Sequence, residues 1–197
     1  LWKARVNFTK SKSIVAEQAD DQIVFAGNTA TWVGGNAAIQ GEPLGVIVGS
    51  RIERDDNGNF VVNASGSYGT ETTMAIDANG NEVPIGTEGS RQITPIIGNP
   101  EPDYVMNFIN TVKYKNFTLG WQLSHTAGGD IVAKTVATLL GRGGIVEDRK
   151  NTFVLPGVRQ DGTTNTLQIN NSTYYFSNVL FGPLELSVYD GSVVRLQ

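Results

Sequence analysis

Residues 104–124 read YVMNFINTVKYKNFTLGWQLS and contain two alternating segments separated by the dipeptide Lys115-Asn116. Apolar residues occupy nearly every second position on both sides of that dipeptide, which is the pattern of half-buried β-strands. A two-residue hairpin turn at Lys115-Asn116 pairs Tyr114 with Phe117, and every later pair follows from that one. Only this register puts both apolar faces on the same side. We therefore predict an antiparallel hairpin of strands 104–114 and 117–126.

Two further segments alternate, near 1–13 and 184–197, the second with a break at Asp190-Gly191. The faces opposite the apolar ones are too polar for the inner layer of a β-sandwich and suit water. Strands of this kind match a barrel wall with lipid outside and an aqueous lumen inside. The sequence thus predicts an all-β fold, a fragment of a large transmembrane antiparallel β-barrel. Six residues are expected to face lipid: Trp2, Phe8, Tyr104, Phe108, Leu119 and Trp121.

Long loops, 14–98 and 128–182, connect these strands, and we expect both to lie on the extracellular side, opposite the tight turn. The first contains short β-like runs, 44–52 and 60–63. The second contains one short helix, for which we predict Asp130 as the N-cap and Gly141 as the stop. Its apolar stripe is Val132, Val136, Leu139 and Leu140.

The composition excludes several classes of function. The chain has no cysteine, so it has no disulfide, thiolate metal site or cysteine nucleophile. The net charge is -4 and Lys and Arg form no cluster, which speaks against nucleic acid as a partner. His125 is the only histidine, and we interpret it as a residue at the membrane interface rather than a ligand-binding group. The chain opens without Met and closes within an alternating segment, so we expect it to be a piece of a longer protein.

Acidic residues in the sequence raise two alternatives to a purely structural role, a calcium site and a pair of catalytic carboxylates. The runs Asp55-x-Asn57-x-Asn59 and Asp77-x-Asn79-x-Asn81 resemble fragments of calcium loops, but the glycine and the closing glutamate of such loops are not where they should be. We interpret both as Asn-Gly turns, with a slightly higher chance of a metal in the second because of Glu88. Among the carboxylates, Glu185 alone lies between apolar residues, and strand alternation explains it. We predict no catalytic site, metal site or cofactor.

Loop aromatics are the candidate ligand contacts. Trp32, Tyr68, Tyr174 and Tyr175, the last two followed by Phe176, could stack on sugar rings or fill a protein interface. Packing within the loops is the alternative. Lys3 and Arg5 are expected to line the lumen, where a plain solvated wall is the alternative.

Several runs of the sequence, taken in order, resemble one protein family. They are Asn7–Lys12, Gly41–Val46, Arg54–Asn59, Ile97–Tyr104, Tyr114–Phe117, Gly128–Ile131 and Val188–Leu196. They look like the C-terminal barrel of the SusC/RagA family of TonB-dependent outer-membrane transporters. The resemblance covers nearly the whole chain, and its most specific part is the run from Gly98 to Tyr104 followed by the Tyr-Lys-Asn-Phe turn.

The resemblance implies a function in the bacterial outer membrane of Bacteroidetes-type bacteria. Family members import glycans or peptides together with a SusD-like lipoprotein that covers the extracellular mouth. TonB would act through a plug region that this chain does not contain. The chain would then supply membrane-embedded wall and extracellular loops, and it would not be an enzyme.

Other functional classes remain as alternatives. The first is a secreted, soluble β-sandwich that binds carbohydrate, in which the aromatic faces would pack against each other. The second is an extracellular glycan hydrolase, which would need two buried carboxylates that the sequence does not nominate.

Overall fold

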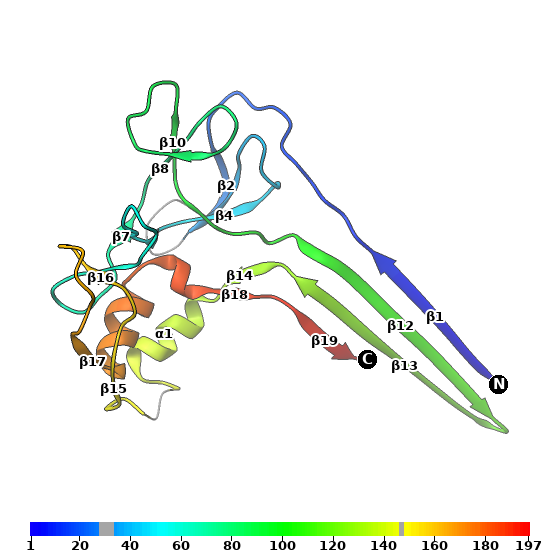
Figure 1. The fold of residues 1–197 in the computed structure, drawn as a ribbon. Coiled ribbons are helices and arrows are strands. Elements are labelled where there is room, and N and C mark those ends of the chain that lie inside the picture. Colours follow the sequence, from blue (N-terminus) through cyan, green and yellow to red (C-terminus); the bar gives the residue numbers. More distant parts are fainter. Residues whose placement is uncertain (28–33, 146–147) are drawn as a thin grey trace.

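The computed structural model describes residues 1–27, 34–145 and 148–197, and it consists of a long antiparallel sheet that projects from an irregular lobe (Figure 1). The long sheet has the strand order β1-β12-β13-β19. Most of the remaining elements are also short strands, so the all-β prediction is correct. No described segment closes the long sheet into a barrel, and the barrel therefore stays a prediction. The four strands are β1 (Trp2–Thr9), β12 (Pro102–Tyr114), β13 (Phe117–Gly128) and β19 (Val193–Leu196).

The central hairpin has the predicted register. Tyr114 pairs with Phe117, and Phe108 pairs with Leu123. Lys115 adopts a left-handed φ of 50°, which tight hairpin turns use to match the twist of their strands. β1 lies antiparallel to β12 on the other side. Because side chains alternate along each strand, most of the large apolar residues of these strands fall on one side of the sheet, while Val105 and Ile109 lie on the other.

The segment 184–197 is not the single strand that we expected. Leu184–Ser187 is a 3₁₀-helix (η2), in which Leu184 is fully buried in the lobe. Val188–Asp190 (β18) pairs with Asp130–Val132 (β14), and only β19 joins the long sheet. The chain also leaves β1 at Thr9, before the expected end at residue 13. Both differences arise because these segments contact residues of the lobe that are distant in sequence.

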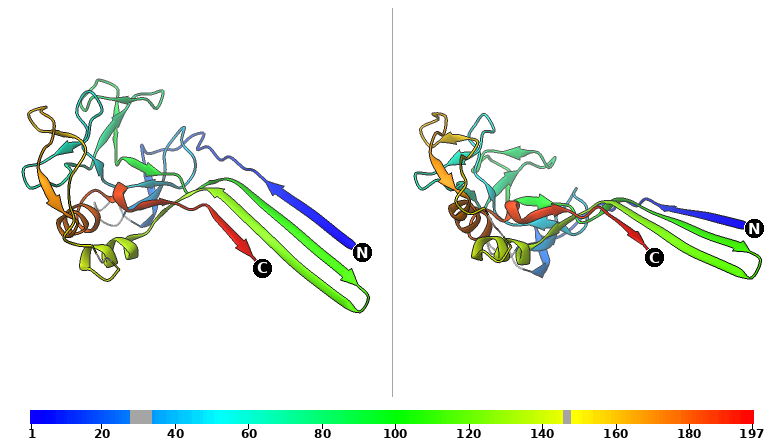
Figure 2. Two further views of the ribbon diagram at one scale, coloured as in Figure 1. Left: turned by 60° about the horizontal axis from the view of Figure 1, so that its bottom comes forward. Right: turned by 90° about the horizontal axis from the view of Figure 1, so that it is seen from below.

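Both long connections fold into the lobe, at the end of the long sheet opposite the Lys115-Asn116 turn (Figures 1 and 2). They therefore lie at the same end of the sheet, and their expected placement on the extracellular side of a membrane stays a prediction. One small sheet has the order β11-β4-β3-β2 and a second has the order β10-β8-β9, and three two-stranded pairs are β5-β7, β6-β16 and β15-β17. These strands are β2 (Ile23–Gly27), β3 (Gly35–Ala38), β4 (Val46–Val48), β5 (Arg51–Ile52), β6 (Val61–Val62), β7 (Thr70–Glu71), β8 (Met74–Ile76), β9 (Glu82–Val83), β10 (Arg91–Ile93), β11 (Ile96–Gly98), β15 (Thr152–Val154), β16 (Val158–Arg159) and β17 (Gln168–Asn170).

Two hydrophobic clusters hold the lobe together. The first contains Val46, Val48 and Ile76 and lies between the two small sheets. The second contains Ile52, Val62 and Leu155, and so joins the two long connections to each other. Burying these side chains is the main stabilising term for such short strands, which could not persist alone.

The helix of the second connection is displaced from its predicted position. α1 spans Lys134–Arg142, its N-cap is Ala133, and Gly143 ends it with a left-handed φ of 84°. Asp130 belongs to β14 instead, and Gly141 is a buried residue inside the helix, where it lies against Leu180. Leu180 ends a π-helix, η1 (Tyr174–Leu180), which follows the short α2 (Asn171–Thr173). Among the described residues, no helix is long and apolar enough to span a membrane.

Candidate functional site

One side of the long sheet, here called the apolar face, exposes large hydrophobic side chains. One row across all four strands consists of Val6, Phe108, Leu123 and Leu196. Leu196 is 73% exposed, and Phe117, beside the turn, is 80% exposed. A contiguous apolar surface of this kind marks contact with a membrane or another protein. The six residues predicted to share this face do so: Trp2, Phe8, Tyr104, Phe108, Leu119 and Trp121.

Aromatic side chains gather at both ends of the apolar face. At the lobe end, Tyr104 stacks on Phe8 and meets His125 edge-on, each with ring centroids 5.4 Å apart. The Tyr104 hydroxyl also lies 3.3 Å from His125 Nδ1. At the turn end are Tyr114 and Phe117. Ten residues separate Tyr104 from Tyr114, which in an antiparallel strand is about 33 Å.

Asn110 interrupts the apolar face near its middle but is only 1% exposed. Its cross-strand neighbour is Trp121, and the indole of Trp2 donates a hydrogen bond to Asn110 Oδ1 at 3.1 Å. The two indoles thus cover the amide, so the face stays apolar on its outside despite this residue.

The opposite side, here called the polar face, carries amides, hydroxyls and cations. Asn107 Oδ1 accepts hydrogen bonds from Ser124 Oγ (2.7 Å) and Gln122 Nε2 (3.1 Å). Lys3 and Arg5, expected to line a lumen, lie on this face because they alternate with the apolar residues of β1. They are exposed, as are Lys113 and Arg195 of the same face.

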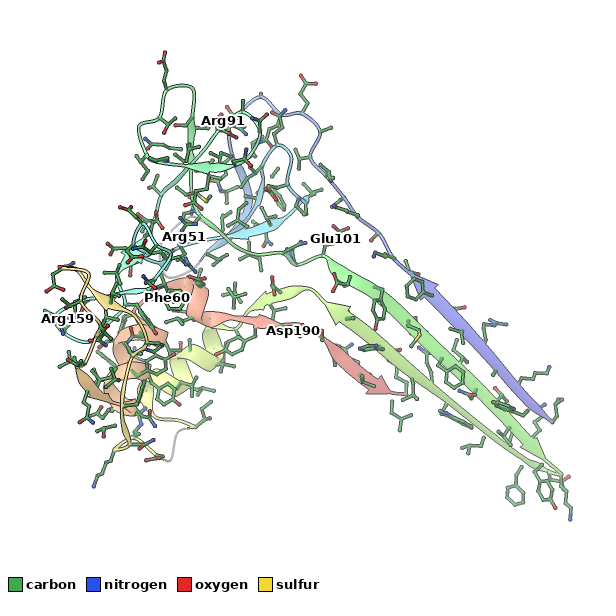
Figure 3. All side chains as sticks on the ribbon, viewed as in Figure 1. Arg51, Phe60, Arg91, Glu101, Arg159 and Asp190 are labelled. Carbon is green, nitrogen blue, oxygen red and sulfur yellow. The ribbon has the colours of Figure 1, made fainter. Side chains whose placement is uncertain are left out.

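Two carboxylates tie the long sheet to the lobe. Glu101, just before β12, accepts hydrogen bonds from the backbone N of Ser13 at 3.0 and 3.1 Å. Asp130 Oδ2 accepts one from the backbone N of Asn99 at 2.7 Å. Figure 3 shows Glu101 and Asp190 at this meeting point of sheet and lobe. Charge-assisted bonds of this kind are the stronger class, so the junction has a defined geometry.

The predicted ligand contacts do not form one exposed cluster. Tyr68 is buried in the second hydrophobic cluster, where its ring meets Phe60 edge-on. Burial raises the pKa of the Tyr68 hydroxyl to about 12, with a smaller contribution from Tyr174. Its ring has no free face for a sugar, which agrees with the packing alternative. Trp32 lies outside the described residues.

Tyr174 and Tyr175 lie at the edge of the same cluster, half-buried. Tyr174 meets Phe153 edge-on at 5.5 Å, and burial raises the pKa of its hydroxyl, as does Tyr175 to a lesser degree. The next residue, Phe176, is 50% exposed and pairs with Phe181, which is 61% exposed. Sequence analysis missed Phe181, because only the π-helix brings it against Phe176.

The acidic runs form turns. The Asp55 carboxylate accepts hydrogen bonds from the side-chain amide of Asn59 and from the backbone N atoms of Asn59 and Asn57, and these bonds lower its pKa. Asp77 repeats the same pattern with its own two asparagines. No group of residues able to hold a metal ion is found in the described ranges.

Glu185 has a structural role. Its carboxylate accepts hydrogen bonds from the backbone N of Ile52 at 2.8 Å and from the Arg54 guanidinium at 2.9 Å. Nearby, Arg51 bridges Glu71 and Glu82, and its hydrogen bond holds the pKa of Glu82 below the usual range. The Arg54–Glu185 ion pair connects η2 to the first connection, whereas the two ion pairs of Arg51 lie within the first connection.

A cleft of about 610 Å³ opens in the lobe between the segment after β1 and the loops that flank β9. Polar groups predominate in its lining, and Arg91 lies 3.8 Å from Asp21 at its wall. The hydrogen-bonding groups that line the cleft are mixed in kind and do not point toward one common position.

Comparisons with known proteins identify a similar outer-membrane receptor. No family model matches the chain. The chain is similar to TonB-dependent receptor P3 of Formosa agariphila, with 25% identity over 205 residues. The match includes the whole chain but spans 19% of the length of that protein. This similarity suggests a transporter rather than an enzyme.

Proposed function

We propose that this chain forms part of the wall and the extracellular surface of a TonB-dependent importer in the bacterial outer membrane. The observation that carries the proposal is the apolar face with aromatic groups at both ends. Strands of about 33 Å that tilt by about 40° span about 25 Å along the membrane normal, which is the height of the apolar band of outer-membrane barrels. The similarity to a TonB-dependent receptor supports the same conclusion.

The soluble sandwich is the weaker alternative. A sandwich needs a second layer on the apolar face, about 10 Å away. None of the residues that the structure describes packs there, and Trp2 is 66% exposed. Lipid is the simplest environment for such a face.

In the proposed importer the chain has a passive role. It belongs to the SusC/RagA type, a plug region elsewhere in the protein couples it to TonB, and the ligand is a glycan or a peptide. The lobe lies outside the cell, where a SusD-like lipoprotein covers it. Tyr174 and Tyr175, with the exposed Phe176 and Phe181, are the aromatic groups we assign to contact with ligand or lid; Trp32 stays a prediction.

Spin labels on single cysteines at positions 117–124 of the intact protein, reconstituted in liposomes, test the membrane assignment. Odd positions should be accessible to oxygen, which partitions into lipid, and even positions to a water-soluble nickel chelate. A label at Asn79, in an exposed lobe turn, is the control and should be accessible to the nickel chelate and not protected by lipid. Equal access of the chelate to all eight positions would contradict the proposal.

The lid contact needs a separate test. Deleting 171–177 would also remove Tyr174 from the lobe core, so substitution is cleaner. The double variant Phe176→Ala/Phe181→Ala should lower co-purification of the lipoprotein while the fold persists. Ile85→Ala, which truncates a 57% exposed side chain elsewhere on the lobe, is the control. If the lipoprotein co-purifies equally well with the double variant, these phenylalanines do not contribute to the interface.

A further inference from the structure

The register of β1 against β12 is not fixed by a turn. The two-residue turn at Lys115-Asn116 fixes how β12 pairs with β13, but β1 is joined to β12 through the connection 10–101. A slip of one residue would move the apolar side chains of β1 to the other face, whereas a slip of two residues keeps each of them on its own face. The alternation of apolar residues therefore does not exclude a slip of two residues, and β1 needs another determinant of its register.

The apolar neighbours across the two strands do not supply this determinant. In the observed register Val6 pairs with Phe108, and Phe8 pairs with Met106. A slip of two residues would place Phe8 opposite Tyr104 in one direction and opposite Phe108 in the other. The observed stack of Phe8 on Tyr104 thus has an aromatic substitute in either slipped register. Contacts among these side chains distinguish the three registers poorly.

Asn110 is the amide on the apolar face of β12, and its contacts depend on the register. Its neighbour on β1 is Ala4, which has a short side chain, and Trp2 reaches the amide from the diagonal position. The indole of Trp2 donates to Asn110 Oδ1 at 3.1 Å, and within the described ranges this is the one side-chain hydrogen bond that joins β1 to β12. Two residues along a strand span about 7 Å, so a slip of two residues would move the indole N–H out of hydrogen-bond reach.

The other half of the Asn110 amide has no partner. Asn110 Nδ2 is buried, and it has no hydrogen-bond acceptor in the part of the chain that the structure describes. Because atoms of this sheet already enclose Nδ2, further strands or a plug region of a longer protein would not reach it. A buried donor without an acceptor costs stability, so stability does not explain the amide. Buried amides that fix the register of paired helices have the same property.

We propose that Asn110 sets the register of β1 on β12 when the wall assembles, through its hydrogen bond with Trp2. In the observed register, the indoles of Trp2 and Trp121 shield the amide. In a slipped register the amide would lose the indole N–H and face lipid, which offers no hydrogen bond. The inference rests on the proposed function for this cost, although any dry surrounding of the apolar face would have the same effect.

Disulfide trapping in the intact protein, refolded from urea into liposomes, tests the proposal. Lys3→Cys is combined with a second cysteine at one of three positions on the polar face. Thr111→Cys, at the observed neighbour of residue 3, reports the correct register. Ile109→Cys and Lys113→Cys report slips of two residues in the two directions. Directly paired Cα atoms lie about 5.5 Å apart, which a disulfide can bridge, whereas diagonal positions are about 7 to 8 Å apart and too distant.

Three variants on the apolar face are compared in this assay. Asn110→Leu removes the amide and should raise the yield of the slipped disulfides about tenfold, since a hydrogen bond whose loss leaves a buried group unpaired is worth about that factor. Its free energy of unfolding should be unchanged or higher. Trp2→Phe keeps a ring beside the amide but removes the donor, and it should raise the slipped yield a few-fold. Met106→Leu, on the same face of β12, is the control and should leave the register intact.

The results separate a determinant of register from a merely structural residue. Slipped disulfides in Asn110→Leu with an undiminished free energy of unfolding would support the proposal. If Asn110→Leu forms the disulfide with position 111 alone, or if the wild-type background slips as often as the variant, the proposal is wrong. An increase in Asn110→Leu without one in Trp2→Phe would overturn the role of the hydrogen bond. Trapping reports the register whether or not the face contacts lipid, so its failure is distinct from a failure of the labelling experiment.

Discussion

Arginine at Val6 should destabilise the protein in a bilayer, whereas arginine at the next residue, Asn7, should not. Val6 is 58% exposed on the apolar face and pairs with Phe108, near the middle of the long strands. Because it is exposed, its replacement leaves no cavity, and in water the change would cost less than about 0.5 kcal/mol. At the midplane of a bilayer an outward arginine costs about 2 to 4 kcal/mol.

Asn7 is the matched control because it is exposed on the same strand but on the polar face. Asn7→Arg should cost less than about 0.5 kcal/mol in either environment. The assay is denaturant unfolding of the intact protein in liposomes, followed by tryptophan fluorescence. Leu119 lies on the same face but closer to the membrane interface. Leu119→Arg should therefore lower the free energy of unfolding less than Val6→Arg does, by about 1 kcal/mol. Equal losses for Val6→Arg and Asn7→Arg would refute lipid exposure of this face.

Three further predictions concern the lobe and its junction. Glu101→Ala should lower the free energy of unfolding by about 1 to 2 kcal/mol, because Ser13 loses a charged acceptor; chemical denaturation measures it. The pKa of Glu82 is lowered in the folded state by Arg51, so its stabilising effect is complete above the ordinary glutamate pKa and is lost as pH falls through the lowered value. Arg51→Met should therefore reduce the fall in melting temperature as the pH decreases below the ordinary glutamate pKa. If the melting temperature of the variant depends on pH in the same way as that of the wild type, this ion pair is excluded as a cause. Gly141→Leu should destabilise α1 against η1 by about 1 to 3 kcal/mol through overpacking, seen as a lower melting temperature.

The long hairpin could be predicted because its information is local. Alternation fixes which side chains share a face, and the tight turn fixes the register. The same reasoning failed for the lobe, where strands of two or three residues depend on remote partners. Val61 pairs in parallel with Val158, for example, almost a hundred residues away. No periodicity within either run indicates that pairing.

The helix and Tyr68 show how remote packing overrides local signals. Asp130 is a good N-cap by type, but its carboxylate already accepts a hydrogen bond from Asn99. Tyr68 lies in the connection 14–98 and was predicted as a loop aromatic that could contact a ligand. Its backbone N donates to the buried Asn178 Oδ1 at 2.8 Å, which fixes it in the core. In both positions the decisive partner lies at least 30 residues away.

Three of the runs that resemble SusC/RagA proteins, Ile97–Tyr104, Gly128–Ile131 and Val188–Leu196, meet where the long sheet joins the lobe. The backbone N of Asp130 donates to Asn99 O, the backbone N of Asn99 donates to Asp130 Oδ2, and the backbone N of Gly191 donates to Gly129 O at 2.6 Å. Ser192 Oγ accepts a hydrogen bond from the backbone N of Gly128 at 2.8 Å. These residues fix the junction between the long sheet and the lobe. The hydrogen bonds among these three runs therefore account for how the lobe is attached to the long sheet.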